Sequence, residues 1–253
     1  MMRAVTEGRG PEGLVLVHGW GFDHRVFDPW LPRLTQRWRV TRTDLPGHGG
    51  SAPLPADAGL EAWADAVRLA VPEDAIWVGW SLGALPLLAA AARGARPRAL
   101  LLLAATPCFC QRDGWPYGLL REELDAMIGG LAEDARRTLR GFHALLGRAG
   151  AGDREALRPW RRRGPGPATA LEPGLSLLRD TDLRGRLAAI DRPTTWLAGG
   201  RDPLVPDGAA KEAARAMPRA RMAYHPEAGH LPFLTHPEWV AGHLHLLSQQ
   251  CRP

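Results

Sequence analysis

A serine flanked by glycines carries the clearest chemistry in this sequence. The stretch Gly79-Trp80-Ser81-Leu82-Gly83 follows an apolar run over residues 75–78 and precedes a helical pattern. A sharp turn from strand to helix crowds the backbone on both sides of the serine, so glycine is needed where a Cβ would clash. The turn would lift the Ser81 hydroxyl above the edge of the sheet. We predict Ser81 as a nucleophile and the backbone N–H of Leu82 as a donor to the oxyanion that forms when a carbonyl is attacked.

A second loop can supply the other oxyanion donor. The stretch Val17-His18-Gly19-Trp20-Gly21 follows the first clear strand pattern, and its turn can direct the N–H of Trp20 into the same pocket. Two backbone donors then form the oxyanion hole. His18 stands at the strand end, where we expect it to make structural hydrogen bonds.

A serine hydroxyl needs an adjacent base at neutral pH, and a third group must orient that base. His230 and Asp202 each lie in a turn a few residues after a predicted strand. Because the carboxyl ends of parallel strands meet at one edge of a sheet, we expect both residues to lie near Ser81. The order serine, aspartate, histidine along the chain is also one in which catalytic triads occur. Asp44 is the rival acid, but it begins a tight Gly/Pro loop and we expect a structural role for it. His143 could line a pocket.

The elements that must position these residues alternate along the chain. Apolar runs bounded by Gly and Pro predict strands buried on both faces, hence a parallel sheet. Helical patterns between them predict an α/β fold with helices flanking the sheet. The expected strands cover residues 14–18, 39–43, 75–79, 99–104, 194–198 and 221–225, and the expected helices 26–36, 60–71, 82–93, 208–216 and 237–250.

The alternation stops in the middle of the chain, which predicts an inserted helical cap. Between residues 108 and 186 there are helical patterns and no good strand. We therefore expect a core of residues 1–107 and 187–253 and a cap of residues 108–186. Helices are expected over 119–131, 135–146, 154–163 and 175–179.

Composition excludes several classes of protein. The 253 residues are 45% hydrophobic and 23% charged, which excludes a disordered chain. No signal peptide and no run of about 18 apolar residues is visible, so we expect a cytoplasmic protein without membrane contact. Three cysteines predict free thiols rather than a disulfide framework. We expect a monomer with no metal and no cofactor.

The positive charge of the chain is concentrated in the cap. Residues 136–163 contain nine arginines and two acids, a net charge of +7, although the whole chain carries only +5. This segment has no recognised nucleic-acid motif and little aromatic interleaving, so we expect no nucleic-acid partner.

The motifs together resemble the α/β-hydrolase superfamily. More closely, they are similar to the biotin-pathway carboxylesterases that demethylate pimeloyl-[acyl-carrier protein] methyl ester. The likeness rests on residues 18–21, 44–47, 76–83 and 106–109, which include the tryptophan before Ser81 and a Pro-Cys-Phe segment, and on 112–116. The resemblance implies an α/β-hydrolase fold with Ser81, Asp202 and His230 as the catalytic residues. It implies substrate contacts at Trp20, Leu82, Phe142, His143, Ala144, Leu145 and Leu146.

Acyl carrier proteins are acidic, so a basic cap face would attract one. The residues assigned to this docking face are Arg136, Arg137, Arg140, Arg154 and Arg158. A general carboxylesterase or thioesterase of short acyl esters is the alternative function. A non-catalytic scaffold that only binds a ligand is a remote alternative, because no member of the triad is missing.

Overall fold

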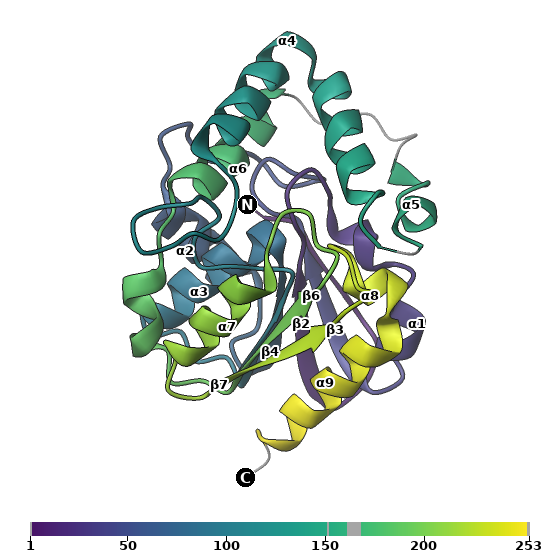
Figure 1. Cartoon of the computed structure of the whole chain (residues 1–253). Coiled ribbons are helices and arrows are strands. Elements are labelled where there is room, and N and C mark those ends of the chain that lie inside the picture. Colours follow the sequence, from purple (N-terminus) through teal and green to yellow (C-terminus); the bar gives the residue numbers. More distant parts are fainter. Residues whose placement is uncertain (1, 151, 161–167, 252–253) are drawn as a thin grey trace.

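A seven-stranded sheet forms the centre of the molecule (Figure 1). The computed structural model describes residues 2–150, 152–160 and 168–251. The strand order is β1-β3-β2-β4-β5-β6-β7, with β1 antiparallel to β3 and all other neighbours parallel. The strands are β1 (Ala4–Glu7), β2 (Glu12–Val17), β3 (Trp38–Thr43), β4 (Ala75–Trp80), β5 (Ala99–Leu103), β6 (Thr194–Gly199) and β7 (Ala220–His225).

The buried strands could be predicted from the sequence, whereas the exposed one could not. Every residue of β4, β5 and β6 is buried, as expected for parallel strands covered on both faces, and all six predicted strands are confirmed within one or two residues. Strand β1 was not predicted; it is an edge strand with three of its four residues exposed. An exposed edge strand needs few apolar residues, so no apolar run marks it.

Helices cover both faces of the sheet (Figure 1). On one face lie α2 (Leu60–Ala70), α3 (Ala84–Ala92) and α7 (Asp207–Arg215), and on the other α1 (Leu31–Leu34) and α9 (Pro237–Gln249). The helix expected over residues 26–36 is instead a 3₁₀ turn, η1 (His24–Phe27), followed by the short α1. Pro29 lies between the two and cannot donate the backbone hydrogen bond that a continuous helix requires.

The cap is built from α4 (Arg121–Leu146), α5 (Asp153–Ala156) and α6 (Ala168–Asp180), which lie above one edge of the sheet (Figure 1). Helix α4 bends at Asp134, where φ is −154° and ψ is 91°. The Asp134 carboxylate accepts a hydrogen bond from the N–H of Arg137 at 2.9 Å and so caps the second arm. The two arms correspond to the helices expected over 119–131 and 135–146.

The other two cap helices differ in length from the prediction. Helix α5 ends at Ala156, well before the expected end at 163, and residues 161–163 lie outside the described part of the chain. Helix α6 is much longer than the expected 175–179. No helix among the described residues is both long and apolar enough to span a bilayer.

Candidate active site

Ser81 occupies a strained turn at the end of β4. Its φ is +53°, a left-handed conformation that is uncommon outside glycine, and it begins the short 3₁₀ turn η2 (Ser81–Gly83). A Cβ on Gly83 would lie 2.6 Å from the carbonyl oxygen of His18, and one on Gly79 would lie 2.7 Å from Cα of Ala84. Glycine is therefore needed on both sides of the serine because other backbone approaches closely, as the motif predicts.

His230 and Asp202 form a buried pair. The Nδ1 of His230 lies 2.8 Å from Oδ2 and 3.0 Å from Oδ1 of Asp202, and both side chains are fully buried. The Asp202 carboxylate also accepts hydrogen bonds from the backbone N–H groups of Leu204 and Val205 at 2.9 and 3.1 Å. Among the described residues, His230 Nε2 has no hydrogen-bond partner. An orienting carboxylate on Nδ1 and an unengaged Nε2 are what a general base requires.

Trp80 connects the serine turn to the histidine loop. Its indole N–H donates to the carbonyl oxygen of His230 at 2.7 Å, across 150 residues of sequence. The indole also packs edge-on against Phe22 and Phe233, with ring centroids 4.9 and 5.1 Å apart. In the sequence Trp80 stands out only as part of a resemblance, and this bond cannot be predicted because no local pattern indicates a partner so far along the chain.

Trp80→Phe is expected to lower kcat about tenfold with little change in KM, because the variant keeps the ring but frees the backbone that carries His230. Leaving that buried carbonyl unpaired should lower the free energy of unfolding by about 1–3 kcal/mol. Trp77→Phe is the matched control, since Trp77 also lies in β4 and donates its indole N–H to a carbonyl, that of Pro72 at 2.9 Å. Equal losses of kcat in both variants, measured with the same ester, would contradict the role given to Trp80.

The loop that carries Trp20 is held beside Ser81. A Cβ on Gly19 would lie 3.1 Å from Cβ of Ser81. The N–H of Leu45 donates to Nε2 of His18 at 2.9 Å, so His18 must carry its proton on Nδ1, which donates to the carbonyl of Gly19 at 2.8 Å. Burial lowers the pKa of His18 and keeps it neutral. The structural role expected for His18 is thus to shape this loop.

Helix α6 lies directly on both predicted oxyanion residues. The indole N–H of Trp20 donates to the carbonyl of Leu171 at 2.8 Å. A Cβ on Gly174 would lie 2.8 Å from Cδ1 of Trp20 and 3.1 Å from Cδ2 of Leu82. The cap therefore contacts the site without a gap at this point, and the contact of Gly174 was not predicted from the sequence.

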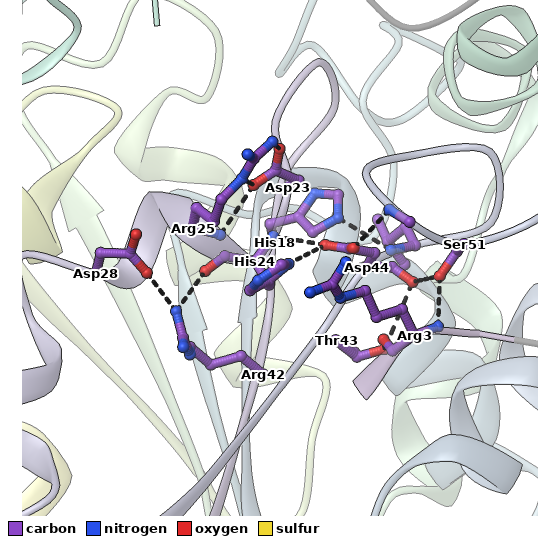
Figure 2. A network of polar contacts seen from close by, with 12 residues as sticks. Arg3, His18, Asp23, His24, Arg25, Asp28, Arg42, Thr43, Asp44 and Ser51 are labelled. Atoms are coloured by element: carbon purple, nitrogen blue, oxygen red, sulfur yellow. Dashed lines mark hydrogen bonds and ion pairs between the residues drawn. The ribbon is translucent and has the colours of Figure 1, made fainter. Parts of the chain in front are cut away.

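Asp44 belongs to a separate polar network, shown in Figure 2. Its Oδ1 accepts from the backbone N–H and from Nδ1 of His24, both at 2.7 Å, and its Oδ2 accepts from the N–H of Gly50 at 2.8 Å. Burial would raise the pKa of Asp44, but the hydrogen bonds from Gly50 and His24 hold it below its usual value. These contacts tie two loops together, which agrees with the structural role expected for Asp44.

The same network brings three possible metal ligands together. Ligand atoms of Asp23, His24 and Asp44 lie within 4.8 Å of one another. Asp23, however, is engaged by the side chain of Arg25 at 2.8 and 2.5 Å, and His24 by Asp44. The donor atoms thus serve hydrogen bonds and ion pairs within the fold.

The predicted substrate contacts in α4 lie at different depths. Phe142 packs edge-on against Trp20 with ring centroids 5.0 Å apart. His143 is buried and packs against Phe22 at 4.9 Å, and Leu146 is fully buried. Ala144 is half-buried, whereas Leu145 is 42% exposed. The structure thus brings Phe142 to the predicted oxyanion loop and leaves Leu145 partly exposed to solvent.

The five arginines assigned to carrier docking are all exposed: three lie on the second arm of α4, Arg154 lies on α5, and Arg158 lies just after α5. Arg158 pairs with Glu155 at 3.2 Å. Within the described residues, no acidic side chain pairs with the other four, Arg136, Arg137, Arg140 and Arg154. This part of the cap therefore presents positive charge that the protein itself leaves largely unbalanced.

Comparison with known proteins agrees with this geometry. The model of the alpha/beta hydrolase family matches residues 14–243, so the chain belongs to that family. A solved esterase from Exiguobacterium antarcticum has the same fold, with a TM-score of 0.84 at 24% identity over 98% of this chain and 94% of that one. The fold class predicted from the sequence is confirmed.

Curated relatives are closer in sequence. A pimeloyl-[acyl-carrier protein] methyl ester esterase of Xanthomonas campestris pv. campestris (strain B100) is 43% identical over 94% of this chain and 95% of its own length. A protein of the same name from Methylococcus capsulatus is 44% identical over 95% of each chain. The resemblance stated from the motifs is confirmed, as is the predicted enzyme class, a carboxylic ester hydrolase.

Proposed function

We propose that this protein hydrolyses the methyl ester of pimeloyl-[acyl-carrier protein] in the cytoplasm, as a step of biotin synthesis. The buried pair of His230 and Asp202, joined through Trp80 to the turn that bears Ser81, is the observation that carries the catalytic part of the proposal. The names of the relatives supply the substrate.

The reaction proceeds through a serine ester. His230 Nε2 takes the proton of Ser81 while Oγ attacks the ester carbonyl, and the backbone N–H groups of Trp20 and Leu82 hold the oxyanion. Asp202 keeps the proton on Nδ1 and stabilises the imidazolium. The imidazolium then returns its proton to the departing methoxide, which leaves as methanol. Water, activated by the same imidazole, hydrolyses the acyl-serine and releases the free carboxylic acid.

The side chains of the cap suit the proposed substrate. Leu139 and Phe142 of α4 pack on the loop of Trp20, since a Cβ on Gly21 would lie 2.8 Å from Cδ2 of Leu139 and 3.9 Å from Phe142. Apolar side chains so close to the predicted oxyanion hole suit an aliphatic acyl chain. The exposed arginines of α4 and α5 suit the acidic carrier that would bear it.

Charge reversal in the cap is expected to lower kcat/KM for the carrier-linked ester about 10–100-fold and to change a small free ester less than twofold, because positive charge speeds encounter with an acidic carrier. The test variant is Arg136→Glu/Arg140→Glu. Its control is Arg9→Glu/Arg96→Glu, which makes the same change in net charge with two other exposed arginines. Rising salt should slow the wild-type reaction on the carrier ester selectively. Equal effects of both double variants would exclude docking at this face.

A general carboxylesterase of short acyl esters is the second candidate, because its triad would be the same. The two functions separate in cells. The gene should restore growth without biotin to a strain that lacks its methyl esterase, and the Ser81→Ala version should not. Growth with neither version, despite folded protein in both, would overturn the biotin proposal and favour the general esterase.

A further inference from the structure

Asp153, the first residue of α5, is a buried carboxylate that the proposed reaction does not use. Its side chain is fully buried, and Oδ2 accepts a hydrogen bond from the N–H of Gly150 at 2.8 Å. Its Oδ1 has no hydrogen-bond partner among the residues that the structure describes. A buried carboxylate oxygen without a partner costs folding free energy unless a nearby charge offsets the loss of water.

The turn that carries Asp153 sits directly on the loop that delivers His230. A Cβ on Gly229 would overlap Oδ2 of Asp153. A Cβ on Gly150 would lie 2.9 Å from the N of Gly229 and 3.2 Å from the carbonyl oxygen of Glu227. Only glycine at these two positions allows the cap to approach so closely. The contact therefore joins α5 to the residue that immediately precedes the predicted base.

The charge of Asp153 is coupled to the catalytic pair. Burial raises the pKa of Asp153, and the Asp202 carboxylate raises it further, whereas the hydrogen bond from Gly150, the side chain of Thr235 in α8 (Pro232–Thr235) and the charge of His230 lower it. Charged groups from the loop after β6 and the loop after β7 thus act on the carboxylate that the cap supplies. When His230 takes the proton of Ser81, positive charge develops close to a second carboxylate.

We propose that Asp153 is a positioning residue of the cap, which seats α5 on the loop of His230 and joins Asp202 in stabilising the protonated imidazole. This inference rests on the proposed function for its catalytic consequence. Because the carboxylate belongs to the cap, the contact of α5 with Gly229 places a second negative charge beside the loop of His230.

Asp153→Asn tests the proposal, since it keeps the size of the side chain and an oxygen for the Gly150 N–H but removes the charge. The His230 imidazole is titrated by NMR in a Ser81→Ala background, which needs no turnover. The midpoint should fall by about one pH unit, because the protonated ring loses a stabilising anion. Glu155→Gln is the control, because Glu155 is an exposed carboxylate in the same helix that pairs with Arg158, and this change should leave the midpoint unchanged.

Steady-state kinetics on a small methyl ester, measured in protein that retains Ser81, supply a second readout. Asp153→Asn should lower kcat about tenfold, leave KM within about twofold, and shift the acidic limb of kcat/KM to lower pH. An unchanged midpoint and an unchanged limb in the folded variant would overturn the proposal. If the asparagine variant does not fold, the same NMR titration is carried out on Asp153→Ser, and the same fall of the midpoint is expected. If the midpoint falls in Asp153→Asn but the wild-type protein does not hydrolyse the carrier-linked ester, the proposed substrate is rejected and this inference still holds.

Discussion

Ser81→Ala is expected to lower kcat for ester hydrolysis by about 10⁶-fold, to the level left by binding and the oxyanion hole alone. The alanine removes Oγ, the atom that forms the acyl-enzyme. The turn that carries residue 81 depends on Gly79 and Gly83, which remain. Initial rates on a methyl ester, with an assay sensitive enough for the residual activity, measure the loss.

Ser248→Ala is the control for this variant. Ser248 is a buried serine in α9, whose hydroxyl donates to the carbonyl of His245 at 3.1 Å and takes no part in the proposed reaction. The control should keep its full kcat. Retention of more than a small fraction of activity by folded Ser81→Ala protein would mean that another group attacks the ester.

Asp202→Asn is expected to lower kcat about 10⁴-fold while leaving the structure intact. Oδ1 of Asp202 accepts from the N–H groups of Leu204 and Val205, so the amide oxygen of asparagine should take that position. The amide NH₂ would then occupy the place of Oδ2, which lies 2.8 Å from His230 Nδ1. A donor there forces the histidine proton onto Nε2, and a protonated Nε2 cannot accept the proton of serine.

The tautomer argument makes this variant distinct from simple loss of charge. Asp207→Asn, which neutralises an exposed acid at the start of α7, should leave kcat unchanged. NMR of the imidazole nitrogens should find the proton on Nδ1 in the wild type and on Nε2 in Asp202→Asn. A tenfold loss or less, with the proton still on Nδ1, would show that another acid orients His230.

The sheet could be predicted because its central strands are buried on both faces. Such strands consist mainly of apolar residues, as in Ala99–Leu103, and can be recognised without knowledge of their partners. The edge strand Ala4–Glu7 was missed because its pairing with β3 defines it, and that pairing is not visible in the local sequence. The helix around Pro29 was predicted too long because it is interrupted where a single backbone N–H is missing.

The three candidate catalytic residues could be assigned to one place in the fold because each follows a parallel strand. Ser81, Asp202 and His230 come after β4, β6 and β7, and topology alone brings those strand ends to one edge. Contacts between the cap and the core could not be predicted in this way. The packing of Asp153 on Gly229 and of Gly174 on Trp20 depends on how helices without strand partners sit on the core.

The most direct test is the mass of the carrier itself. Purified protein is incubated with pimeloyl-[acyl-carrier protein] methyl ester, and the intact carrier is followed by mass spectrometry while methanol is measured separately. We expect the carrier to lose the mass of one methylene group, with one methanol released per carrier, and Ser81→Ala protein to leave both unchanged. A carrier stripped of its acyl chain, or a methyl ester that persists while small esters are consumed, would contradict the account.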